Sequence, residues 1–76
     1  MGSGDEIMTF SIRLKQLRKE YKITQPQLAQ AVNITDRTLR NYESGTMEPN
    51  LSVLTALADY FQCSVDYITG RSDSRE

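Results

Sequence analysis

Apolar side chains recur along the chain at spacings of three and four residues, in five short groups that polar turns separate. Residues three and four apart share one face of an α-helix, so each group predicts a short amphipathic helix. The first of the five groups predicts a helix from about Ser11 to Lys22. The groups are Phe10, Leu14, Leu17 and Tyr21; Leu28, Ala29 and Val32; Leu39 and Tyr42; Leu51, Leu54, Leu57, Ala58 and Phe61; and Val65 and Ile68. No segment reads convincingly as a strand, so the pattern predicts an all-α fold.

Capping residues predict where these helices begin and end. Thr24 and Gln27 have the spacing of a capping box at the start of the second helix. Pro26 falls in the first turn of that helix, where its missing N–H costs nothing. The remaining predicted N-caps are Thr35, Asn50 and Ser64, and the predicted terminators are Gly45 and Gly70.

The second and third predicted helices are joined by Asn33 and Ile34 alone. So short a connection holds two helices at a steep angle, as in a helix-turn-helix. The close approach needs a small residue, which Ala29 supplies, and the turn needs a residue that tolerates a positive φ. Asn33 is the best choice for that position after glycine. These features occur in register, and together they predict a helix-turn-helix unit.

The chain resembles the Cro and phage-repressor type of helix-turn-helix domain, also called the xenobiotic-response-element family. The stretches that carry the resemblance are Leu17-Arg18, Ile23 to Ala29, Asn33 to Thr35, Asn41 to Gly45, Glu48-Pro49, Leu54, Leu57-Ala58 and Ser64 to Gly70. The resemblance implies a compact five-helix bundle of the lambda-repressor-like type. It also implies binding to double-stranded operator DNA, as a homodimer, and a bacterial or phage origin. The lone Cys63, which cannot form a disulfide within the chain, fits a reducing cytoplasm.

Two features depart from the family pattern. The family usually has glycine where this chain has Asn33, and its loop after Gly45 often carries Lys or Arg. Here Thr46-Met47-Glu48 offers no positive charge. The missing cation weakens the expected clamp on the DNA backbone.

The ends of the chain lie outside the predicted domain, which spans residues 8–70. Residues 1–7 are predicted to be a disordered leader or a cloning remnant, and residues 71–76 a polar tail.

Composition excludes several classes of protein. The 76 residues include one cysteine and no histidine, which rules out a disulfide framework and leaves no ordinary zinc ligand set. No apolar run is long enough to cross a membrane. No paired carboxylates or nucleophile–base constellation suggests an enzyme, and no cofactor or metal site is predicted.

The net charge of −1 hides an uneven distribution. Residues 8–45 carry seven Lys and Arg against three acidic residues, a net +4, whereas residues 46–76 carry a net −3. A basic first half suggests a nucleic-acid or other acidic partner. The alternative is a solvated mixture of charges, and charge alone does not decide between the two.

The third helix carries the predicted base-reading residues. If Leu39 and Tyr42 mark its buried side, a rotation of 100° per residue places Arg37, Arg40, Asn41 and Ser44 on the opposite side. Arg can bond O6 and N7 of guanine together, and Asn can pair with N6 and N7 of adenine. We predict that Arg37, Arg40 and Asn41 read bases. The alternative is a merely solvated face.

Four further residues are predicted to contact the DNA backbone: Gln25, Thr35, Ser44 and Thr46. Capping is a sufficient alternative role for Thr35. The family resemblance implies in addition that Arg18 and Glu43 form a structural ion pair between the first helix and the end of the third.

These observations favour a sequence-specific DNA-binding regulator, most simply a repressor, over two other classes. The second class is a protein-interaction module on the same fold, either an antitoxin or an antagonist of another regulator. The near-neutral charge and the loop without cations keep it open. An enzyme ranks third.

Overall fold

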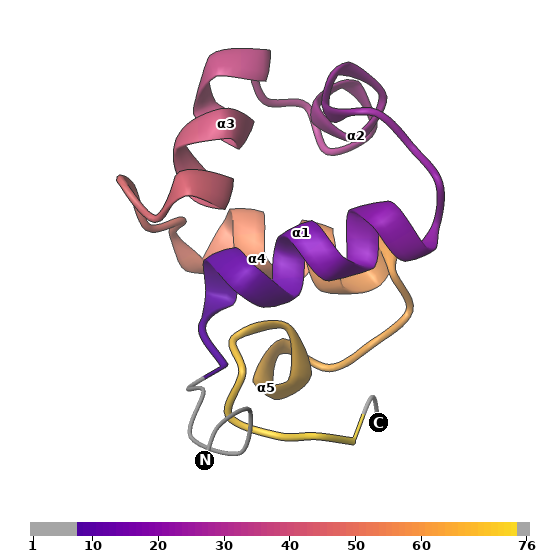
Figure 1. Cartoon of the computed structure of the whole chain (residues 1–76), viewed down its shortest axis with the longest axis vertical. Helices are drawn as coiled ribbons and strands as arrows, with labels where there is room; N and C mark the ends of the chain where they lie inside the picture. The colour runs from indigo at the N-terminus through magenta and orange to yellow at the C-terminus, as the bar shows by residue number, and fades with distance from the viewer. Residues whose placement is uncertain (1–7, 75–76) are drawn as a thin grey trace, which may run out of the picture.

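The structure, a computed structural model, describes residues 8–74, so the expectation for residues 1–7 falls outside the described residues. The predicted all-α fold of five helices is confirmed, and no strand occurs among the described residues (Figure 1). The helices are α1 (Phe10–Glu20), α2 (Gln25–Ala31), α3 (Asp36–Ser44), α4 (Leu51–Tyr60) and α5 (Val65–Ile68). Residues 71–74 of the predicted tail follow α5 outside any helix, and the amides of Arg71 and Ser72 donate to the carbonyl of Asp66.

Every helix begins at a side-chain cap, and the sequence indicates four of the five. Thr24, Thr35, Asn50 and Ser64 each accept a hydrogen bond from the amide three residues ahead. The capping box is confirmed, because Gln27 also accepts from the amide of Thr24. The sequence analysis missed the cap of α1, where Thr9 accepts from the amide of Ile12. That cap explains why α1 begins at Phe10 rather than Ser11.

The predicted end of the first helix is wrong by two residues. Lys22 has a φ of +58°, in the left-handed region, and therefore cannot continue the helix. The chain reverses there, and the amide of Ile23 donates to the carbonyl of Arg18 over 3.2 Å. Asn33, with a φ of +64°, and Gly45, with a φ of +81°, adopt the left-handed conformations that the sequence predicts.

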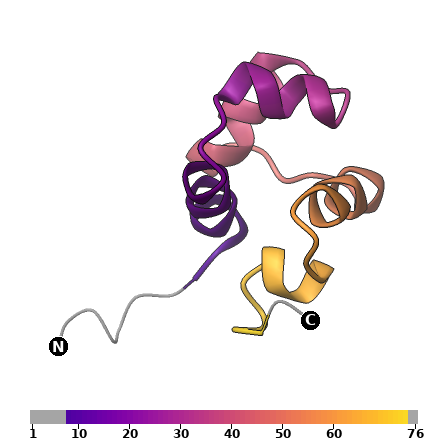
Figure 2. The same ribbon diagram turned by 90° about the vertical axis from the view of Figure 1, so that its right-hand side faces the viewer.

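The helices pack around one core. α2 and α3 pack against each other at one end of the molecule, and α5 closes the other end (Figure 1). Figure 2 shows α1 and α4 on opposite sides, with α1 on the side where α2 begins. α1 contacts both α3 and α5, and therefore connects the two ends.

Ten apolar residues form the buried core among the described residues, and all of them belong to the predicted stripes. They are Leu14, Leu17, Leu28, Ala29, Leu39, Tyr42, Leu57, Ala58, Phe61 and Ile68. Two predicted members are exposed, and four others, Phe10, Val32, Leu54 and Val65, are half-buried against the core. Leu51 is 70% exposed, because the core cluster reaches only to Val53 and Leu54 at that end of α4. Tyr21 is 39% exposed, although its hydroxyl donates to the carbonyl of Phe61 and its ring packs edge-on against the Phe61 ring.

Arg13 is buried, which the sequence analysis did not anticipate. The residue is only 4% exposed, and its guanidinium lies 3.7 Å from the centre of the Tyr67 ring of α5. Its Nη2 lies 3.8 Å from a carboxylate oxygen of Asp73, which is itself fully exposed. Within residues 8–74, Nε and Nη1 of Arg13 are buried with no hydrogen-bond partner. Arg13 therefore joins α1 to α5 mainly by stacking.

We predict that Gly70→Ala destabilises the domain more than Gly45→Ala. Both glycines have a positive φ, so each substitution costs about 1–2 kcal/mol in backbone strain. A Cβ at Gly70 would also lie 2.5 Å from the carbonyl oxygen of Met8, whereas at Gly45 its nearest neighbour is the Ser11 hydroxyl at 3.6 Å. Chemical denaturation of both variants should separate them by about 1 kcal/mol or more. Equal losses would contradict the close contact between Met8 and Gly70.

We predict that Arg13→Met leaves the free energy of unfolding within about 1 kcal/mol of the wild type, because Met keeps the packing on Tyr67 and removes two unsatisfied buried donors. Arg13→Ala removes the packing as well and serves as the control, with an expected loss of about 2–4 kcal/mol. Thermal and urea unfolding measure both variants. A large loss in Arg13→Met alone would show that the charge itself stabilises the fold.

Candidate nucleic-acid interface

The turn between α2 and α3 holds these helices at a fixed angle. The amide of Ile34 donates to the carbonyl of Ala29 over 2.9 Å, and the amide of Asn33 donates to the carbonyl of Gln30 over 3.2 Å. Ala29 is buried, and this small side chain lets α2 approach α3 closely. Because these contacts lie within one short segment, α2 and α3 form a rigid two-helix unit.

The outer face of α3 is polar and accessible. Arg37, Arg40 and Ser44 are exposed, and Asn41 on the same face is half-buried. Leu39 and Tyr42 are buried on the opposite face. The helix is fixed at both ends, by Thr35 at its start and by left-handed Gly45 at its end. One capped helix thus carries the three predicted base-reading side chains together with Ser44.

The end of α3 folds back over one carbonyl group. The carbonyl of Asn41 accepts from the amides of Thr46 and Met47, at 3.0 and 3.2 Å, and from the Ser44 hydroxyl at 3.1 Å. The hydroxyls of Ser44 and Thr46 lie 2.8 Å apart. The structure therefore brings together two of the four predicted backbone-contacting residues, both of them exposed.

Arg18 and Glu43 lie together in a network that links three helices. Nε and Nη2 of Arg18 donate to the two carboxylate oxygens of Glu43, at 2.6 and 3.1 Å. The Arg18 side chain is 15% exposed and the Glu43 side chain 3%. Nη1 of Arg18 also donates to the carbonyl of Ile23 over 3.1 Å. One guanidinium thus joins α1 to α3 and to the turn before α2.

Gln25 belongs to the same network. Its Nε2 donates to a carboxylate oxygen of Glu43 over 3.1 Å, a contact that the sequence analysis did not anticipate. The paired carboxylate therefore fixes the side chain of Gln25 at the first residue of α2. Local sequence gives no signal for this bond, because its two residues are 18 positions apart.

Thr35 lies at the start of α3, and its hydroxyl is already engaged. It accepts from the Thr38 amide at 3.1 Å and donates to the Thr38 hydroxyl at 2.8 Å. The capping role suggested as the alternative for Thr35 is therefore present. Gln25 and Thr35 each lie at the N-terminus of a helix, where backbone amides favour an anion.

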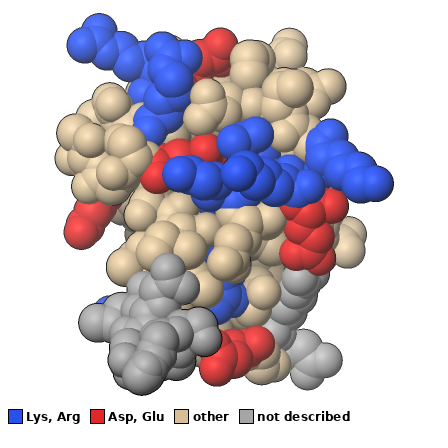
Figure 3. Space-filling model, in the orientation of Figure 1, with Lys and Arg blue, Asp and Glu red and all other residues tan. Residues whose placement is uncertain are grey.

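The seven cations of residues 8–45 do not share one surface. Arg13 is buried and Arg18 is paired with Glu43. Arg37 and Arg40 are exposed on α3, while three lysines are exposed on or just after α1. Figure 3 shows Lys and Arg atoms in a band over α1 and in a second group beside α3 at the upper left.

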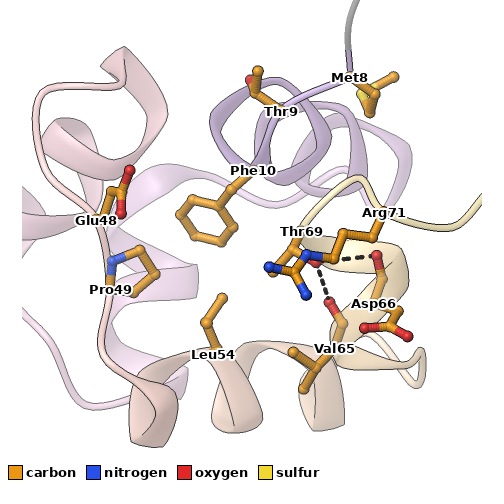
Figure 4. Close-up of a pocket in the computed structure, with 10 residues that line it drawn as sticks. All are labelled: Met8, Thr9, Phe10, Glu48, Pro49, Leu54, Val65, Asp66, Thr69 and Arg71. Atoms are coloured by element: carbon orange, nitrogen blue, oxygen red, sulfur yellow. Dashed lines mark hydrogen bonds between the residues drawn. The ribbon is translucent and has the colours of Figure 1, made fainter.

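A groove of about 500 Å³ lies between the start of α1, the segment before α4, and α5 (Figure 4). Apolar side chains of Phe10, Leu54 and Val65 line it, and charged groups of Asp66 and Arg71 lie at α5 and just after it. It contains none of the predicted DNA-contacting residues. Among residues 8–74 there is no cluster of three potential metal ligands, and no helix there is long and apolar enough to cross a membrane.

Comparison with known proteins gives a family match over most of the chain. A family model described as Helix-turn-helix matches residues 14–68. The chain is 43% identical over 61 residues to the uncharacterized HTH-type transcriptional regulator YobD of Bacillus subtilis, covering 80% of this chain and 54% of that protein. It is 40% identical over 63 residues to the immunity repressor protein of Bacillus phage phi105, covering 83% and 44%. The chain thus spans about half the length of the curated relatives it matches.

The fold is also similar to that of a solved complex. The P22 c2 repressor, in complex with a synthetic operator, superposes with a TM-score of 0.80 and 31% sequence identity. The match covers 86% of this chain and 98% of that one.

We predict that Glu43→Gln destabilises the domain by about 3–5 kcal/mol, because it leaves the Arg18 guanidinium largely buried without its carboxylate. Arg18→Met in the same background should recover part of the loss, since it removes the uncompensated charge. A double-mutant cycle on urea unfolding measures the coupling. A loss of less than about 1 kcal/mol in Glu43→Gln would contradict a structural role for the pair.

Proposed function

Because this chain belongs to the Cro/C1-type helix-turn-helix family, we propose that it is a sequence-specific DNA-binding transcriptional regulator, most simply a repressor, that docks α3 in the major groove of an operator. The observation that carries the proposal is the outer face of α3. Arg37, Arg40 and Asn41 lie there on one capped helix, held against α2 by a tight turn. Similarity to the P22 c2 repressor, which was solved in complex with a synthetic operator, supports binding to operator DNA.

Each of the three side chains suits a base edge in the major groove. An exposed Arg on a helix can donate two parallel hydrogen bonds to guanine, and an Asn amide can both donate to and accept from adenine. Arg37 and Arg40 are three positions apart on α3, so they lie about one turn apart on the same face. We assign base reading to these two residues and to Asn41.

Contacts with phosphates would fix the position of α3 in the groove. Gln25 lies at the start of α2, held by Glu43, and Thr35 lies at the start of α3. Ser44 and Thr46 lie side by side at the end of α3. These four residues lie around the proposed base-reading face, and such contacts position a protein on DNA without reading sequence.

We further propose that two copies bind together on one operator. A single recognition helix reads few base pairs, and dimers of this kind of domain read two half-sites about one helical turn apart. α5 and the segment after it are the proposed surface for the second copy. The homodimer would thereby double the number of base contacts in one binding event.

The proposed action needs neither a cofactor nor catalysis. A bound dimer represses by covering the DNA that transcription requires. We place this action in the bacterial cytoplasm, because the relatives described above come from a bacterium and a bacterial phage.

A second candidate function is binding to a protein, as an antitoxin or an antagonist of another regulator. The loop after α3 favours it, because Thr46, Met47 and Glu48 carry no positive charge and Met47 is 43% exposed. A weakly acidic loop with an exposed Met is better suited to a protein surface than to phosphates. Selection on DNA distinguishes the two candidates.

We predict that selection from a random duplex library returns a two-fold symmetric motif, and that Arg37→Ala relaxes it at one base pair in each half-site. Removing the bidentate hydrogen bonds should cost about 1–3 kcal/mol of discrimination at that pair. Sequencing of the selected pools measures both effects. Gln30→Ala, a substitution of another exposed residue at the far end of α2, is the matched control and should leave the motif unchanged.

Three results would argue against the proposal in different ways. A wild-type selection that yields no motif would favour the protein-binding candidate. A motif without two-fold symmetry would contradict the homodimer. A motif unchanged by Arg37→Ala would contradict the assignment of that residue to base reading.

A further inference from the structure

Three exposed lysines lie along the outer side of α1 and the turn that follows it. Lys15 and Lys19 are one helical turn apart on α1, and Lys22 follows in the turn. We call these three residues the α1 lysine ridge. Leu14 and Leu17 face the core from the other side of the helix. In Figure 3 the band of Lys and Arg atoms crosses the molecule over α1.

The ridge adjoins the residues proposed to approach the DNA backbone. Arg18 lies between Lys15 and Lys22 along the chain, and its guanidinium bonds Glu43 of α3. The same carboxylate holds Gln25 at the start of α2. Figure 2 shows α1 on the side of the molecule where α2 begins, with α4 on the far side. The helix that carries the ridge therefore adjoins the start of α2.

The spacing of Lys15 and Lys19 does not favour the stability of α1, although Lys19 in the last turn complements the helix dipole. Lys15 and Lys19 are four positions apart, where like charges on a helix destabilise it. Neither lysine has an acidic residue three or four positions away in the sequence: those positions hold Ser11, Ile12, Gln16, Arg18, Lys22 and Ile23. A helix shaped by stability alone would alternate the signs of these charges. The arrangement instead suits an external line of negative charge.

The rest of the proposed interface supplies few cations for phosphates. Arg37 and Arg40 are assigned to bases, Arg13 is buried, and Arg18 is paired with Glu43. The loop after α3 carries no positive charge. The α1 lysine ridge is therefore the main group of exposed cations that remains in the first half of the chain.

We propose that the α1 lysine ridge binds phosphates of the DNA backbone beside the base pairs read by α3, and replaces the basic loop that this chain lacks. This inference rests on the proposed DNA-binding function. The contacts would be electrostatic and independent of sequence, because lysine meets phosphate as a point charge. They would raise the salt dependence of binding without changing the selected motif.

The test compares three proteins on two duplexes. The proteins are the wild type, a Lys15→Gln, Lys19→Gln and Lys22→Gln triple variant, and the corresponding triple Lys→Arg variant. The duplexes are the selected operator with long flanks and a scrambled sequence of equal length. Affinity is measured from low to moderate salt, and thermal unfolding checks that each exposed substitution leaves the fold intact.

We expect the Gln variant to flatten the slope of log affinity against log salt by about 0.9 for each phosphate that the protein no longer neutralises, or about 2.7 for three. The Arg variant should keep the wild-type slope. The flattening should appear on both duplexes, and the motif selected by the Gln variant should be unchanged. A Thr55→Glu variant, which lowers the net charge by one at an exposed position of α4, a helix that neither proposed surface includes, should leave the slope unchanged.

An unchanged slope in the Gln variant would overturn the inference, even if the operator motif is intact. Equal flattening per charge in Thr55→Glu would also overturn it, because it would indicate a general effect of net charge. If the slope on DNA were unchanged but the Gln variant no longer bound poly-glutamate, the ridge would instead be a surface for an acidic protein. If selection returned no motif, flattening on the scrambled duplex alone would support the ridge and refute sequence-specific regulation.

Discussion

The buried ion pair between Arg18 and Glu43 fixes the geometry of the proposed interface. Arg18 uses three nitrogens, two on the Glu43 carboxylate and one on the carbonyl of Ile23, and the carboxylate also accepts from Gln25. The network joins α1, the start of α2 and the end of α3. Leaving either the Arg18 guanidinium or the Glu43 carboxylate unpaired in the interior would be costly. These three segments therefore cannot shift independently. The orientation of α3 therefore depends on a pair of side chains to which no base-reading role is assigned.

Folding divides the cations of this nearly neutral chain into two groups. Folding removes Arg13 and Arg18 from the surface by stacking and pairing, and it leaves Arg37 and Arg40 exposed on α3 and three lysines exposed on or just after α1. Net charge counts all of these cations alike. The structure divides them into cations that hold the fold together and cations that remain available to a partner, and the second group is smaller than the seven cations of residues 8–45 indicate.

Local signals predicted most of the fold correctly. Capping residues and left-handed positions act over three or four residues, so Thr24, Asn33 and Gly45 each specify a turn or a helix end without help from the core. The predictions were wrong at residues whose burial or backbone conformation depends on the segments that pack against them. Leu51 continues the apolar stripe of α4 but lies beyond the core. Lys22 was predicted to end the first helix, but in the structure it has a left-handed backbone conformation in the turn.

The sequence by itself determined the five helices, the tight turn between α2 and α3, and the polar outer face of α3, because helical periodicity and caps are short-range properties. The tertiary structure alone decided most partners of the charged residues. Asp73 approaches Arg13, and Gln25 joins Glu43, because folding brings together segments that are far apart in the chain. No periodicity encodes such pairs, since their energy depends on burial and on the distance between charges.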